Sequence, residues 1–129
     1  MLRILAIART LASLPLLGIG AMHLFGTAPL APILEGARIP MAEANAQVAP
    51  VIEVLAGLLL LVGWRARLGA LLGLFSMIGA LTAHLRFDHS QFEWPDEPPI
   101  ALPITVLVLC LLVILRGGGA WSLDARRNR

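Results

Sequence analysis

The chain has 129 residues, of which 58% are hydrophobic and only 14% are charged, and its net charge is +2. Soluble domains carry about 25% charged residues, so this deficit, with a mean hydropathy of +0.84, excludes an ordinary soluble domain and indicates a membrane protein. The pI of about 10.0 does not indicate nucleic-acid binding, because the basic residues, all of them arginine, lie at or near the ends of apolar segments.

Four apolar segments approach or exceed the length of a membrane span, which is about 20 mostly apolar residues. They cover residues 4–25, 48–64, 68–85 and 100–115. The second and fourth are short, and the helix-forming residues 42–47 can extend the second, in which case Pro50 would kink it. We therefore predict an all-α polytopic membrane protein, with residues 1–129 forming a single domain of four transmembrane helices in an up-and-down bundle.

The first apolar segment starts with a basic residue, as a signal peptide does. However, Arg9 interrupts the apolar run, the run is long for a signal peptide, and Pro29 follows the best cleavage motif. We therefore expect the segment to be retained as a membrane span. Arg9 is expected to snorkel to the membrane interface, and an inner ion pair or a bound lipid phosphate is the alternative.

The distribution of arginine predicts the orientation. In a four-span arrangement only Arg38 and Arg86 fall on one side of the membrane. The arginines on the other side are Arg3, Arg9, Arg65, Arg67, Arg116, Arg126, Arg127 and Arg129. Because positively charged loops stay in the cytoplasm, we expect a multi-pass inner-membrane protein in the lipid bilayer, with both termini cytoplasmic.

Ionisable side chains within the spans are the candidates for function. They are His23 in the first span, Glu53 in the second and His84 at the end of the third, all near the predicted outer face. A charge in the bilayer costs on the order of 2.5–3.5 kcal/mol, so such residues usually have a partner or a function. Each also shares a stripe of small or polar residues on its helix, the face that packs against other helices. We predict that His23, Glu53 and His84 line one outward-open pocket as ligand-binding or proton-relay groups; hydrogen bonding that only supports the bundle is the alternative.

The two outer loops are expected to contribute less. Residues 30–37 are predicted to form a short, lid-like helix lying at the membrane interface. In the second loop, His84, Asp88 and His89 resemble a loose set of metal ligands, but only His84 and Asp88 share a helix face. Because a metal site needs three or four convergent ligands, we predict no metal site.

The sequence lacks familiar catalytic motifs. Cys110 is the only cysteine and lies in an apolar run, which excludes dithiol chemistry and predicts a buried apolar role. There is no glycine-rich phosphate loop, serine nucleophile elbow or flavin fingerprint. The sequence therefore predicts no intrinsic cofactor and leaves open whether the protein is an enzyme.

The order of several short motifs resembles the DoxX and DoxX-like membrane proteins over nearly the whole chain. The first two are Gly20-x-x-His23-Leu24 and Glu53-x-x-x-Gly57-Leu-Leu-Leu-Leu-x-Gly63. A turn arginine, small residues and a terminal histidine follow in the third span, and the tail reads Gly117-Gly-Gly-Ala-Trp-Ser-Leu-Asp-Ala. In this tail Gly118 and Ala120 replace the proline or basic residue often found in the family.

The resemblance implies a four-helix bundle in the cytoplasmic membrane. Some relatives are subunits of thiosulfate:quinone oxidoreductases and others assist membrane oxidoreductases. The resemblance thus implies an accessory subunit that binds a quinone or a similar amphipathic ligand at His23, Glu53 and His84, with a redox complex or further copies of the chain as partners. A structural subunit that anchors a membrane complex is the alternative. The glycines from Gly117 are expected to form a flexible stop after the fourth span.

Overall fold

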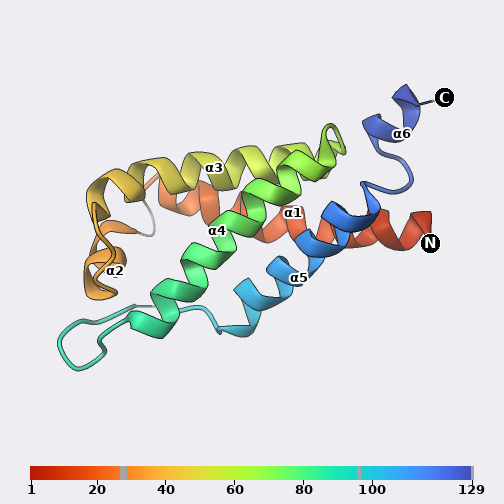
Figure 1. Ribbon diagram of the computed structural model, residues 1–129. Helices are drawn as coiled ribbons and strands as arrows, with labels where there is room; N and C mark the ends of the chain where they lie inside the picture. The colour runs from red at the N-terminus through yellow and green to blue at the C-terminus, as the bar shows by residue number, and fades with distance from the viewer. Residues whose placement is uncertain (27–28, 96, 129) are drawn as a thin grey trace.

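The computed structural model describes residues 1–26, 29–95 and 97–128, and these residues form helices and no strand (Figure 1). The helices are α1 (Leu2–Leu24), α2 (Ala31–Gly36), α3 (Ala42–Val62), α4 (Ala66–Arg86), α5 (Ala101–Arg116) and α6 (Leu123–Arg127). Of these, α1, α3 and α4 are long and apolar enough to cross a membrane, and α5 is a shorter apolar helix. The predicted all-α class is confirmed.

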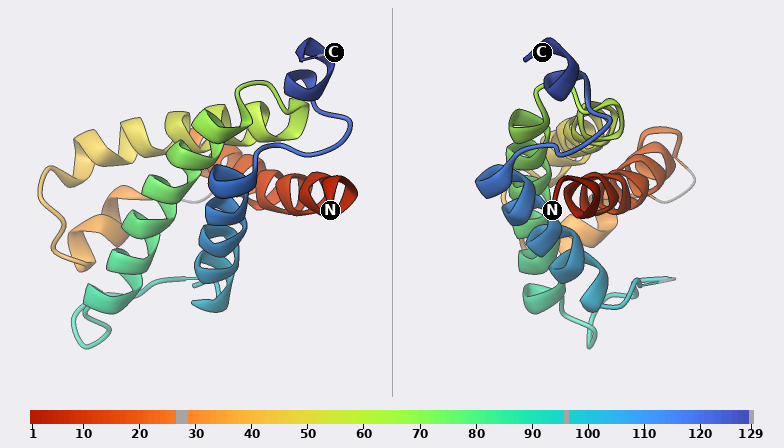
Figure 2. Two further views of the ribbon diagram at one scale, coloured as in Figure 1. Left: turned by 45° about the vertical axis from the view of Figure 1, so that its right-hand side comes forward. Right: turned by 90° about the vertical axis from the view of Figure 1, so that its right-hand side faces the viewer.

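The four long helices form one bundle in which α1 packs on α3, α3 on α4, α4 on α5, and α5 back on α1. Both termini lie at one end of this bundle, while α2 and the α4–α5 loop lie at the other (Figures 1 and 2). The helix bounds stay close to the predicted spans. The largest difference is the start of α3 at Ala42, which uses the helix-forming extension and keeps Pro50 buried inside the helix.

Small residues allow the helices to approach closely. A Cβ atom added at Gly69 would lie 2.8 Å from Leu59 Cβ, and one at Gly73 would lie 3.0 Å from the sulfur of Cys110. Cys110 itself is fully buried, as predicted. The predicted small-residue stripe of α4 is therefore the surface on which α3 and α5 pack.

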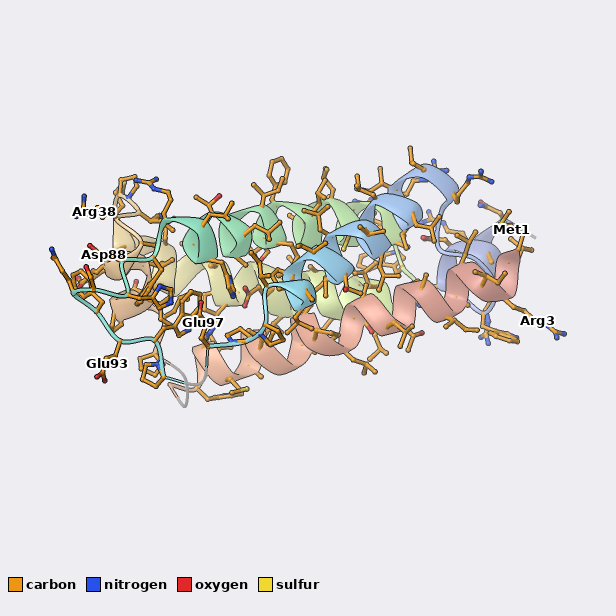
Figure 3. The ribbon with its side chains drawn as sticks, turned by 90° about the horizontal axis from the view of Figure 1, so that it is seen from below. Met1, Arg3, Arg38, Asp88, Glu93 and Glu97 are labelled. Carbon is orange, nitrogen blue, oxygen red and sulfur yellow. The ribbon has the colours of Figure 1, made fainter. Side chains whose placement is uncertain are left out.

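The outside of the bundle is apolar between two charged ends. Large apolar side chains such as Leu14, Leu58 and Val108 are about half exposed. Figure 3 labels Met1 and Arg3 at one end and Arg38, Asp88, Glu93 and Glu97 at the other. An apolar belt between polar ends matches the profile of a bilayer.

The predicted snorkelling of Arg9 is wrong. Its side chain is only 3% exposed. The guanidinium donates hydrogen bonds to Gly118 O at 3.0 Å and Leu61 O at 2.7 Å, and also to Leu60 O. Carbonyls in the last turn of a helix lack helical partners, so the end of α3 and the chain after α5 offer buried acceptors to Arg9.

The predicted flexible C-terminal stop is also replaced by an ordered structure. The chain folds back over the α3–α4 turn and forms α6, which Ser122 caps by accepting a 3.0 Å bond from Ala125 N. The Asp124 carboxylate accepts hydrogen bonds from the backbone N–H groups of Arg65 and Ala66, each at 2.8 Å. Arg9 and Asp124 thus satisfy the open ends of α3 and α4 at one turn.

Candidate functional site

A cavity of about 800 Å³ occupies the end of the bundle opposite the termini. Its wall comes from the second half of α1, the first half of α3, the second half of α4 and the start of α5. Segment α2 and the α4–α5 loop close it at the end of the bundle. Most of the wall is apolar, including Leu16, Ile19, Ile52, Met77 and Leu102. The predicted residues His23, Glu53 and His84 all line this one cavity.

His23 and Glu53 face each other across the α1–α3 interface. His23 Nδ1 lies 3.5 Å from Glu53 Oε2, and the two side chains are only 14% and 7% exposed. Neither atom has a hydrogen-bond partner within the part of the chain that the structure describes. The pair is therefore at ion-pair distance without the alignment of a hydrogen bond.

Gly20 explains why these two side chains meet. A Cβ atom at Gly20 would lie 2.9 Å from Glu53 Cβ and 3.1 Å from the backbone nitrogen of Val54. Only glycine lets α1 approach α3 so closely, and His23 is one turn beyond Gly20 on the same face of α1. The spacing Gly20-x-x-His23 thus has a direct structural consequence.

Ser76 is a site residue in addition to the predicted trio His23, Glu53 and His84. Its hydroxyl donates a 3.0 Å hydrogen bond to Glu53 Oε1, and the side chain lines the cavity. The sequence feature that indicates Ser76 is its position on the small-residue stripe of α4. Thr82, which lies off that stripe, donates instead to Ile78 O of its own helix.

His84 is held at the loop side of the cavity. Its Nδ1 lies 2.8 Å from Ala80 O and its Nε2 lies 3.0 Å from Pro98 O. The imidazole also packs on Trp94, with ring centroids 4.6 Å apart. Both ring nitrogens are thus engaged with backbone carbonyls, so the closer contact within the predicted trio is that between His23 and Glu53.

The cover over the cavity consists of α2 and the α4–α5 loop. Phe87 packs against Gly36 so tightly that a Cβ there would lie 2.5 Å from its ring, and Asp88 N donates to Gly36 O at 3.1 Å. Phe87 also contacts Trp94, with centroids 5.1 Å apart. The short helix α2 lies within the predicted residues 30–37, and these contacts join it to the loop.

The loose metal-ligand set does not converge. His89 pairs with Glu97 at 2.9 Å, while the Asp88 carboxylate accepts bonds from Ser90 and lies 3.7 Å from Arg38. Across residues 1–26, 29–95 and 97–128, no three His, Cys, Asp or Glu side chains group closely enough to hold a metal ion.

Comparison with models of known protein families shows which family the chain belongs to. The DoxX family model matches residues 4–85, which cover α1 to α4 and include His23, Glu53 and His84. The chain belongs to the DoxX family. Family membership and the long apolar helices together place this DoxX protein in a membrane. No curated protein and no solved structure matches the chain.

Proposed function

We propose that this DoxX protein binds an amphipathic molecule of the bilayer, such as a quinone, and serves a membrane oxidoreductase system as an accessory subunit. The cavity volume of about 800 Å³ falls within the range of small-molecule pockets. The wall is apolar with a few convergent polar groups, so it is complementary to a molecule with an apolar body and one polar head.

The buried pair of His23 and Glu53 carries the proposal. Buried polar atoms in native structures almost always have hydrogen-bond partners, yet Nδ1 of His23 and Oε2 of Glu53 have none among the described residues. Both residues line the cavity. A ligand head that bridges the two atoms from the cavity side would supply the missing partners, whereas an apolar filling would leave both atoms unsatisfied.

The cavity also has a route to the lipid. Several of its wall residues are exposed, among them Val48 of α3 and Phe75 and Gly79 of α4. Val48 is 53% exposed and Phe75 is 64% exposed. A molecule dissolved in the bilayer could pass between α3 and α4 at this point.

The proposed orientation in the membrane and the need for a redox partner follow from the charges and the residue composition of the chain. The arginine distribution supports an orientation in which the cavity is at the outer face of an inner membrane and both termini are in the cytoplasm. The chain has a single cysteine and no flavin fingerprint. We therefore assign any electron transfer to a partner complex and to the ligand, with this protein holding the ligand's head.

Filling the cavity tests ligand binding. Gly79 lines the cavity at an exposed position and an added Cβ would meet no atom within 4 Å, so Gly79→Phe should place a large side chain at the rim of the cavity without a clash. Gly18 has the same free space in a helix but is not a wall residue, so Gly18→Phe is the matched control.

Trp94 lines the cavity and can report on binding after Trp64 and Trp121, which do not line it, are replaced by phenylalanine. A short-chain benzoquinone should quench Trp94 saturably, and Gly79→Phe should weaken binding by about 10-fold or more, equivalent to about 1.4 kcal/mol. Gly18→Phe should leave binding unchanged. Linear, unsaturable quenching, or equal binding by both variants, would contradict the proposal.

A structural subunit is the second candidate, and one observation favours it. Glu53 joins three helices, because it packs on Gly20 of α1, belongs to α3 and accepts a hydrogen bond from Ser76 of α4. Glu53→Gln keeps the shape and removes the titratable proton, and Glu43→Gln on the exposed start of α3 is the control. A structural role predicts normal folding, assembly and activity of the membrane complex in Glu53→Gln. A proton-relay role predicts normal accumulation with lost activity.

A further inference from the structure

We propose that the cavity selects a hydroxyl head group, so that the reduced phenolic form of a ligand, such as a hydroquinone, binds more tightly than the carbonyl form. This inference rests on the proposed function and specifies the ligand's chemical class. It follows from the unpaired atoms of the His23–Glu53 pair.

One of the two atoms is a hydrogen-bond donor and the other is a hydrogen-bond acceptor. Nδ1 of His23 and Oε2 of Glu53 lie 3.5 Å apart in a buried site. Two donors or two acceptors at this distance would repel each other, and burial would strengthen that repulsion. The pair is therefore either a carboxylate facing an Nδ1–H or a carboxylic acid facing a bare Nδ1, and each arrangement offers one donor and one acceptor.

A hydroxyl group satisfies this pair completely. Its hydrogen binds the acceptor, and its oxygen lone pairs receive the donor. A carbonyl or ether oxygen accepts only, and would leave the acceptor of the pair unsatisfied. The hydroxyl gains a hydrogen bond to this buried acceptor that a carbonyl or ether oxygen cannot make, which strengthens binding by about 2- to 150-fold, so the preference for the hydroxyl should be large enough to measure.

Other polar groups of the wall already have hydrogen-bonding contacts. Oε1 of Glu53 already accepts from Ser76, and both ring nitrogens of His84 lie at backbone carbonyls. The amide of Asn45 donates to Pro40 O at 2.9 Å. The unpaired atoms of His23 and Glu53 are therefore where we place the hydroxyl.

A pair of ligands without redox chemistry tests the selection. The probes are 4-heptylphenol and its methyl ether, 4-heptylanisole, titrated into the full chain in nanodiscs with Trp94 as the reporter. The phenol should bind about 10-fold or more tightly than the ether. Equal binding of the two probes at the cavity would overturn the hydroxyl selection while leaving ligand binding intact. Failure of both probes and of the benzoquinone would overturn the proposed function as well.

Variants of the pair locate the selection. In His23→Leu and in Glu53→Gln the ratio of phenol to ether affinity should fall to about 3-fold or less, because one side of the donor–acceptor pair is lost or changed. Two variants are used so that a folding failure in one leaves the other informative. Asn45→Ala, a change of another polar wall residue, should keep the wild-type ratio. An unchanged ratio in either folded pair variant would overturn the proposal.

Discussion

The hydroxyl of Ser76 donates a hydrogen bond of 3.0 Å to Oε1 of Glu53, which joins α4 to the buried carboxyl group of α3. Glu53 also lies against Gly20 of α1. The Glu53 side chain thus joins α1, α3 and α4 at the wall of the cavity. This arrangement fixes Oε1 within the protein and leaves Oε2 directed at His23.

Ser76→Ala should destabilise the bundle. The substitution removes the donor to Oε1 and leaves a buried carboxyl oxygen without a partner, which should lower the free energy of unfolding by about 1–3 kcal/mol. Thr82→Val is the control, because the Thr82 hydroxyl bonds to Ile78 O within its own helix. Denaturant unfolding in detergent would measure both. Equal stability of the two variants would contradict the structural importance of the Ser76–Glu53 bond.

Gly20→Ala should weaken the contact between α1 and α3. The added methyl group would lie 2.9 Å from Glu53 Cβ and 3.0 Å from Val54 Cγ2, so the helices must separate. Overpacking of this kind lowers stability by about 1–3 kcal/mol. Gly18→Ala meets no atom within 4 Å and should be neutral or slightly stabilising. Thermal unfolding in detergent compares the two, and a Gly20→Ala protein as stable as Gly18→Ala would show that the close approach is not needed.

Arg9→Lys should be destabilising although the charge is kept. The planar guanidinium donates from separate nitrogens to Gly118 O and to the carbonyls of Leu60 and Leu61, and a single ammonium group cannot reproduce that geometry. Losing one or two of these buried bonds should lower the free energy of unfolding by about 2–3 kcal/mol. Arg3→Lys at an exposed position is the control and should change little. Equal effects of both changes would argue against the buried role of Arg9.

Asp88 provides a pH-dependent prediction outside the membrane spans. Hydrogen bonds from Ser90, first its hydroxyl and then its backbone N–H, hold the pKa of the Asp88 carboxyl below its ordinary value, with a smaller contribution from the charge of Arg38. A lowered pKa in the folded state means that this contribution to stability is present above the unfolded-state pKa and is lost as the pH falls through the folded-state pKa. Ser90→Ala should raise the Asp88 pKa, and carbon NMR titration of the carboxyl would measure it. An unchanged pKa would contradict the role of the hydroxyl.

The sequence predicted the helices well because their signals are local. Apolar runs set the spans, and the i, i+3 and i+4 spacing placed His23, Glu53 and His84 on packed faces. The same rule could have identified Arg9, which shares a stripe with Ser13 and Gly20, and the stripe position of Ser76 was visible too. The prediction placed Arg9 at the membrane interface because arginine is attracted to it, although Arg9 lies on the packed face of α1.

Other features depend on contacts between distant segments. The bonds from Arg9 to Gly118 and from Asp124 to the start of α4 join residues over a hundred and over fifty positions apart, so neither follows from local pattern. The engagement of His84 by Pro98 likewise depends on the path of the loop. The beginning of α6 had a local signal, because Ser122 precedes Asp124 as a helix cap precedes an acidic first turn.

The most direct test of ligand binding at the His23–Glu53 cavity is photolabelling in membranes with a photoreactive short-chain benzoquinone, followed by peptide mass spectrometry. We predict that label concentrates on wall residues such as Ile52, Ser76 and Leu102, that an unlabelled benzoquinone competes for it, and that Gly79→Phe reduces it while Gly18→Phe does not. Label spread along the exposed apolar belt, without competition and equal in both variants, would contradict the account.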